Sequence, residues 1–80
     1  MKEELKLVSN IKDLLLGMDI PERDRNPHWL AREAGLTYRI VLNLYNSETI
    51  PYTTQMGTLL AIAQVLGVTV DDLYTIEDVD

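Results

Sequence analysis

The stretch from Leu30 to Asn46 most constrains the fold, because it predicts two short helices that meet at a glycine. Leu30, Ala31 and Ala34 repeat at i, i+1 and i+4, which gives the first of these helices a narrow apolar stripe. Gly35 stands where the stripe stops. Glycine adopts a positive φ more readily than any other residue and commonly ends a helix. The sequence therefore predicts a sharp corner at this point.

A second helix is expected directly after the corner. Thr37 can cap it, and Val41 and Leu44 supply its apolar positions. Ala31 is small at the point where the second helix must cross the first closely, and a larger side chain there would push the two apart. Two short helices joined by a tight glycine turn form a helix-turn-helix, which places its second helix in a DNA groove.

The rest of the chain predicts three more helices. A first helix is expected at about residues 7–17, followed by a loop at 20–26 and by Asn26-Pro27, a favourable helix start. A broad apolar face between Thr54, the expected cap, and Gly67 predicts a fourth helix. Thr69 then predicts the cap of a short fifth helix. Residues 75–80 are compatible with a frayed tail or with a short pairing strand.

Length and composition narrow the function classes. Eighty residues predict one domain, with a core at about 7–74 and an acidic tail at 75–80. The absence of cysteine and the presence of a single histidine, His28, exclude disulfides, thiolate metal sites and histidine clusters. No nucleophile has an evident partner base, and no glycine-rich phosphate loop occurs. We therefore expect neither an enzyme nor a cofactor. No small-molecule ligand is evident.

The formal net charge of −6 is unevenly spread along the chain. Residues 1–49 hold all seven basic residues and eight acidic ones, whereas residues 50–80 hold five acidic residues and no basic one. Non-specific affinity for nucleic acid depends on lysine and arginine at phosphates, so we expect it to be weak. No apolar run approaches the ~20 residues of a membrane span, and the start does not look like a secretory signal. We expect a cytoplasmic protein without a membrane partner.

From about residue 26 to residue 74, the order of these pieces resembles the Cro/C1-type (XRE-like) helix-turn-helix family of phage repressors and bacterial regulators. The resemblance implies a bacterial or phage origin and a compact, all-α, five-helix domain in which helices 2 and 3 form the helix-turn-helix. It also implies a regulator that binds operator DNA. The matching pieces are Leu30-Ala31, Ala34-Gly35-Leu36-Thr37, Val41 and Leu44-Tyr45-Asn46, followed by Thr58-Leu59-Leu60-Ala61-Ile62-Ala63, Leu66-Gly67-Val68-Thr69 and Asp72-Leu73.

The resemblance also implies which residues contact DNA, since the start of the third helix would enter the major groove. Arg39 can reach guanine O6 and N7, and Asn43 can pair with adenine N6 and N7. The expected base-reading residues are Tyr38, Arg39, Leu42 and Asn43. The expected phosphate-contacting residues, which position the protein without reading sequence, are Arg25, Arg32, Thr37, Asn46 and Ser47.

Binding as a homodimer to a near-palindromic operator is a further expectation, because one short reading helix seldom gives useful specificity and two add their base contacts. The expected dimer surface consists of Leu73, Tyr74, Ile76 and Val79.

Departures from the family pattern leave an alternative open. Pro27 and His28 replace the usual glutamine near the start of the second helix, and Glu48 replaces a favourable lysine after the third. The alternative is a protein-interaction module on the same scaffold, an anti-repressor or antitoxin-type partner with little or no DNA binding. A positive or neutral face around Arg39 favours the regulator. An apolar or acidic face there favours the interaction module.

Overall fold

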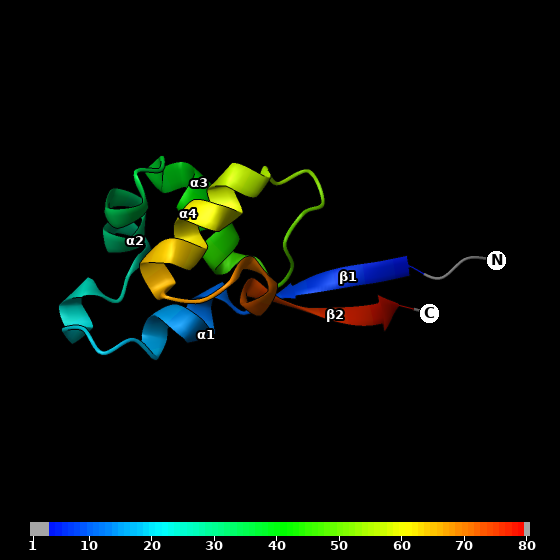
Figure 1. Ribbon diagram of the computed structural model, residues 1–80, viewed down its shortest axis with the longest axis horizontal. Coiled ribbons are helices and arrows are strands. Elements are labelled where there is room, and N and C mark those ends of the chain that lie inside the picture. Colours follow the sequence, from blue (N-terminus) through cyan, green and yellow to red (C-terminus); the bar gives the residue numbers. More distant parts are fainter. Residues whose placement is uncertain (1–3, 80) are drawn as a thin grey trace.

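The computed structural model describes residues 4–79, with side chains for residues 6–77, and this part forms a helical body with a projecting arm (Figure 1). The body holds four α-helices and two short 3₁₀ turns, and the arm is a two-stranded antiparallel sheet. The elements are β1 (Glu4–Ser9), α1 (Ile11–Leu16), η1 (Glu22–Asp24), α2 (Pro27–Ala34), α3 (Tyr38–Asn46), α4 (Met56–Leu66), η2 (Val70–Leu73) and β2 (Tyr74–Val79).

The expectation of a five-helix, all-α domain is wrong at both ends of the chain. The predicted first helix begins only at Ile11, because the residues before it form β1. The predicted fifth helix is one 3₁₀ turn, η2. The physical reason lies in pairing. Polar and apolar residues alternate from Glu4 to Leu7 with the period of a strand, and β2 on one side and the segment after α3 on the other hydrogen-bond the backbone groups of β1. Short isolated helices are marginal by comparison.

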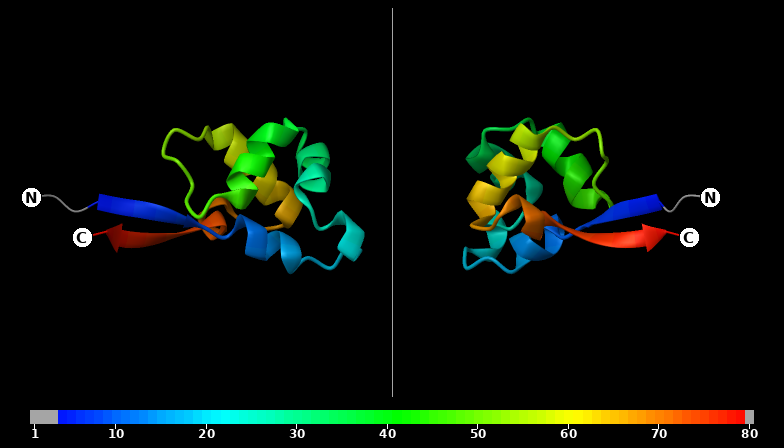
Figure 2. Two further views of the ribbon diagram at one scale, coloured as in Figure 1. Left: turned by 180° about the vertical axis from the view of Figure 1, so that it is seen from behind. Right: turned by 45° about the vertical axis from the view of Figure 1, so that its right-hand side comes forward.

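The two ends of the chain form the arm together. Leu7 lies opposite Ile76, and Ser9 lies opposite Tyr74. The C-terminal segment is therefore the pairing strand, one of the two alternatives that the sequence left open. In Figures 1 and 2 the arm extends away from the helices, and the described part measures 47 × 22 × 20 Å along its principal axes.

The predicted start of α2 is confirmed at Asn26. Its Oδ1 accepts a hydrogen bond from the backbone N–H of Trp29 at 3.0 Å, and Pro27 occupies the first helical position. Such a cap contributes about 1 kcal/mol, because it satisfies a backbone donor that has no partner within the helix. The expected cap at Thr54 is wrong, since the residue that precedes α4 is Gln55.

Glycine ends α2 and α4 as predicted. Gly35 has φ 70° and Gly67 has φ 74°, both in the left-handed region. The backbone N–H of Leu36 then donates to the carbonyl of Ala31 at 2.9 Å, which closes the corner between α2 and α3. Thr69 is confirmed as the cap of the following turn, since its side chain and that of Asp72 form a reciprocal capping box.

The core lies where the four helices and η2 meet and contains aliphatic side chains. Leu30 and Ala31 supply the face of α2 that the sequence predicts, and Val41 and Leu44 supply that of α3. None of the helices in the described part is long and apolar enough to span a membrane. The buried residues are Ile11, Leu15, Leu30, Ala31, Val41, Leu44, Ile50, Leu59, Ile62, Ala63, Leu66 and Leu73.

Candidate nucleic-acid interface

Helix α3 presents one face to the core and the opposite face to solvent. Val41 and Leu44 hold it against the other helices, with 0% and 4% of their surfaces exposed. Arg39 and Asn43 are exposed and four residues apart, so they lie one turn above each other on the outer face. Asn46, three residues after Asn43, is also exposed. The two residues predicted to pair with bases are thus brought together on a rigid element.

The charge of this face fits a polyanionic partner. α3 contains no acidic residue and carries the guanidinium of Arg39. Among the side chains that the structure describes, the ion pairs join Arg23 to Asp24 and Arg32 to Glu33, so Arg39 has no carboxylate partner. Helix α3 itself therefore carries one positive and no negative side chain, although the whole chain is acidic.

A stacked ring pair joins the beginnings of α2 and α3. The ring centroids of His28 and Tyr38 are 3.7 Å apart, and the ring planes are inclined by 5°. His28 is the second residue of α2, and Tyr38 is the first of α3. No sequence pattern indicates this contact, because both residues lie on exposed helix faces and only the angle of the glycine corner brings them together. The stack fixes the ring of Tyr38 at the edge of the α3 face.

The five predicted phosphate-contacting residues fall into two groups. Arg25 and Ser47 are partly engaged within the protein: the Arg25 Nε donates to the Ile20 carbonyl at 3.1 Å, and the Ser47 hydroxyl donates to the Thr49 carbonyl at 2.6 Å. Both side chains therefore stabilise loops. The other three predicted residues, Arg32, Thr37 and Asn46, are exposed.

Arg32 and Thr37 are the members of this set nearest to the α2–α3 corner. The side chain of Arg32 is 72% exposed, with its Nε 3.8 Å from a carboxylate oxygen of Glu33, a loose pair that a phosphate can replace. Arg32 follows His28 by four residues and shares its face of α2. Thr37 occupies the N-cap of α3 without a capping hydrogen bond from its side chain.

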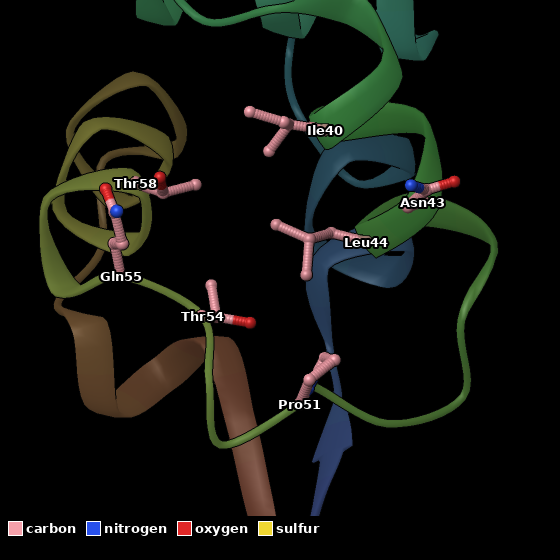
Figure 3. Close-up of a pocket in the computed structure, with 7 residues that line it drawn as sticks. All are labelled: Ile40, Asn43, Leu44, Pro51, Thr54, Gln55 and Thr58. Atoms are coloured by element: carbon pink, nitrogen blue, oxygen red, sulfur yellow. The ribbon is translucent and has the colours of Figure 1, made fainter.

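The predicted role of Leu42 as a base-reading residue has weak geometric support, because this side chain is half-buried. Ile40 is instead the exposed aliphatic residue of α3, at 44%. It borders a groove of about 350 Å³ between α3 and the start of α4. In Figure 3, Ile40 and Leu44 point from α3 toward Thr58 on α4. Asn43 also lines the groove, although in this view its amide group is turned to the other side of α3.

The expected dimer surface is only partly exposed. Leu73 is completely buried, so its assignment to that surface is wrong: the side chain packs into the core. Tyr74 is half-buried and Ile76 is 56% exposed. The side chain of Val79 lies outside the described residues, although its backbone belongs to β2.

The phenol of Tyr74 hydrogen-bonds to the carboxylate of Asp71 at 3.3 Å. Burial raises the pKa of this phenol above its ordinary value of 10.0, and the charge and the hydrogen bond of Asp71 act in the same direction. The contact fastens the beginning of β2 to η2.

Comparison with known proteins gives one family match. The family model described as Cro/C1-type HTH DNA-binding domain matches residues 20–78. The match includes α2, α3 and α4 and ends within β2, whereas β1 and α1 lie before it. Neither the curated proteins nor the solved structures contain a match.

Proposed function

The chain belongs to the family of Cro/C1-type HTH DNA-binding domains, and we propose that it is a transcriptional regulator that binds operator DNA in a sequence-specific manner. The observation that carries the proposal is the outer face of α3, where Arg39 and Asn43 stand exposed one turn apart. Below them, Val41 and Leu44 are fixed in the core. A rigid helix that projects an arginine and an amide is suited to reading base edges in the major groove.

In this proposal, α3 lies in the major groove with Arg39 at a guanine and Asn43 at an adenine. Tyr38, held by His28, lies at the groove edge, within reach of a phosphate or a thymine methyl group. Thr37, Arg32 and the exposed amide of Asn46 contact phosphates and set the position of the helix. Arg25 and Ser47 contribute mainly by stabilising the loops whose carbonyl groups accept their hydrogen bonds.

The regulator acts by occupancy, as a repressor that covers a promoter or operator, and catalyses no reaction. We propose that two copies bind the two halves of a near-palindromic operator, because two reading helices double the number of base contacts. Action on operator DNA implies the cytoplasm of a bacterium, with the protein encoded by that bacterium or by a phage.

A protein-interaction module is the second candidate, favoured by exposed apolar side chains on α3 and α4. Ile40 is 44% exposed, and Met56 and Leu60 on α4 are 59% and 48% exposed. Exposed apolar side chains can mark a protein contact. The absence of an acidic residue on α3 favours DNA over this alternative.

Selection of bound sequences from a random duplex pool tests the proposal. Low salt is required, because few cations of this acidic chain can contact phosphate and binding weakens as salt rises. The test variant is Arg39→Ala, Asn43→Ala, and the matched control is Gln64→Ala, an exposed position on α4. We expect an enriched palindromic motif with the unmodified chain and the control, and its loss with the double variant.

Absence of enrichment with all three proteins, each shown to be folded by circular dichroism, would overturn the proposal in favour of the interaction module. Equal enrichment with the double variant would place base reading outside α3.

A further inference from the structure

We propose that His28 makes the DNA affinity of this chain depend on pH, because its protonated ring contacts a DNA phosphate and its neutral ring contacts it only weakly. The inference rests on the proposed function and adds control by protons to the same interface. Three observations carry it: the place of the ring, the free nitrogens of the ring, and the presence of a single histidine in the chain.

The ring of His28 lies at the edge of the proposed reading face. It is exposed near the start of α2 and stacks on Tyr38, the first residue of α3, with centroids 3.7 Å apart and planes inclined by 5°. In a helix-turn-helix, the first helix crosses the DNA backbone while the start of the second contacts base edges. A ring that joins the starts of the two helices therefore lies beside the backbone in the proposed complex.

The ring nitrogens of His28 are available to a partner outside the chain. Among the side chains that the structure describes, no ion pair and no side-chain hydrogen bond includes His28. The stack covers one face of the ring and leaves the ring edge, which carries both nitrogens, uncovered by Tyr38. The imidazole is thus held in place by its face and can donate from its edge.

Protonation changes what this ring offers to an anion. A neutral imidazole has one N–H donor and one acceptor nitrogen, whereas the imidazolium has two N–H donors and a positive charge. The acceptor nitrogen takes one proton from solvent, and a phosphate oxygen then accepts a charge-assisted hydrogen bond from the ring. The face of an aromatic ring attracts a cation placed over it, so Tyr38 holds the protonated ring as well as the neutral one.

The charged groups near His28 leave the role of counter-ion to the DNA. Asp24 forms its ion pair with Arg23 at 3.9 Å. Glu33 forms its ion pair with Arg32 at 3.8 Å. Helix α4, which also packs against α2, contains no charged or titratable side chain. The charged and titratable groups of the neighbouring segments are Glu22, Arg23, Asp24 and Arg25 before α2, Arg32 and Glu33 on α2, and Tyr38, Arg39 and Tyr45 on α3.

The direction of the pH effect follows from linkage between proton binding and DNA binding. A phosphate of bound DNA favours the imidazolium over the neutral ring, so DNA binding takes up a proton. By reciprocity, the affinity for DNA must rise as the pH falls. Histidine is the side chain that ordinarily changes charge between about pH 5 and about pH 8, and His28 is the only histidine of the chain. One residue therefore accounts for the pH dependence in this range.

Fluorescence anisotropy titrations at about pH 5.5 and about pH 7.5, at constant ionic strength, test the inference on the selected operator and on an unrelated duplex. We expect the unmodified chain to bind about two- to fivefold more tightly per bound chain at the lower pH, the effect of one exposed charge pair. The factor should be the same on both duplexes, since a phosphate contact carries no sequence information. His28→Gln keeps a hydrogen-bonding side chain without a charge and should lose the effect. His28→Arg, with a permanent charge, should bind tightly at both pH values.

Two further measurements identify the phosphate contact itself. The plot of log affinity against log salt concentration should be steeper at the lower pH by about 0.9 per bound chain, because one more cation contacts a phosphate. A methylphosphonate removes the charge of a single phosphate, and we place it in turn along the operator backbone. We expect it to abolish the pH effect at one position in each half-site. Circular dichroism at both pH values checks that each variant is folded.

The outcomes separate this inference from the proposed function. Equal affinities at the two pH values, or a pH effect that persists in His28→Gln, overturn the role of His28 while the regulator proposal stands. A pH effect that no methylphosphonate changes overturns the phosphate contact. Equal binding to the operator and to the unrelated duplex, with the pH effect present on both, overturns sequence-specific reading and supports the phosphate contact of His28. A chain that binds no duplex at either pH overturns both proposals.

Discussion

The imidazole ring of His28 lies flat on the phenol ring of Tyr38, with centroids 3.7 Å apart and planes within 5° of parallel. The contact joins the first turn of α2 to the first residue of α3 across the glycine corner. It therefore adds a packing contact between α2 and α3 outside the aliphatic core.

Substitution of His28 and Tyr38 should reveal an energetic coupling between the two side chains. In a double-mutant cycle of His28→Ala and Tyr38→Ala, measured by urea unfolding, we expect a coupling energy of about 0.5–1 kcal/mol. Because both rings are exposed to solvent, we expect the coupling energy to lie toward the lower end of the range for aromatic pairs. Additive effects of the two substitutions would show that the stack contributes nothing to stability.

Leu73→Ala should destabilise the fold strongly, because Leu73 is 0% exposed and truncation leaves a cavity in a small core. We expect a loss of about 2–5 kcal/mol in the free energy of unfolding. The matched control is Leu60→Ala on α4, where the side chain is 48% exposed and the expected change is within about 0.5 kcal/mol. Similar losses for the two variants, measured by urea unfolding, would contradict the burial of Leu73.

Gly35→Ala isolates the backbone cost of the corner, since an added Cβ meets no atom within 4 Å and only the φ of 70° is unfavourable. We expect a loss of about 1–2 kcal/mol. Gly57→Ala, also without a close neighbour but inside α4, should stabilise by about 0.5–1 kcal/mol. Thermal unfolding of both variants measures the two changes in stability. A change of the same sign in both variants would contradict the left-handed backbone conformation at Gly35.

Arg39→Ala tests base reading directly. If Arg39 contacts a guanine, the variant should lose about 1–3 kcal/mol on the selected operator and bind unrelated duplexes almost as the unmodified chain does. Fluorescence anisotropy titrations on both duplexes provide the measurement. Equal losses on the two duplexes would place the guanidinium on a phosphate instead.

The stability of the fold should decline at high pH through Tyr74. Its pKa is raised in the folded state, so the neutral phenol is favoured there, and the stabilisation is complete below the ordinary value of 10.0. It is lost as pH rises through the folded pKa. Urea unfolding at about pH 8 and about pH 11 should show a steeper decline for the unmodified chain than for Tyr74→Phe. Asp71→Asn should give an intermediate slope, and identical slopes would contradict the contact.

Local patterns in the sequence predicted the helix-turn-helix and the side chains that it exposes. These patterns are Gly35, Asn26 with Pro27, and the spacing of Val41 and Leu44. Each acts through neighbours a few residues away, so the helix ends and the buried face follow without knowledge of the fold. The outward position of Arg39 and Asn43 follows from the same helical periodicity.

What only the tertiary structure decided depends on residues far apart in the chain. The pairing of Leu7 with Ile76 converts a predicted helical turn into β1, since a strand needs a partner that periodicity alone does not reveal. Leu73 is drawn into the core because η2 packs against α4, and the His28–Tyr38 stack exists because the corner sets one angle between two helices.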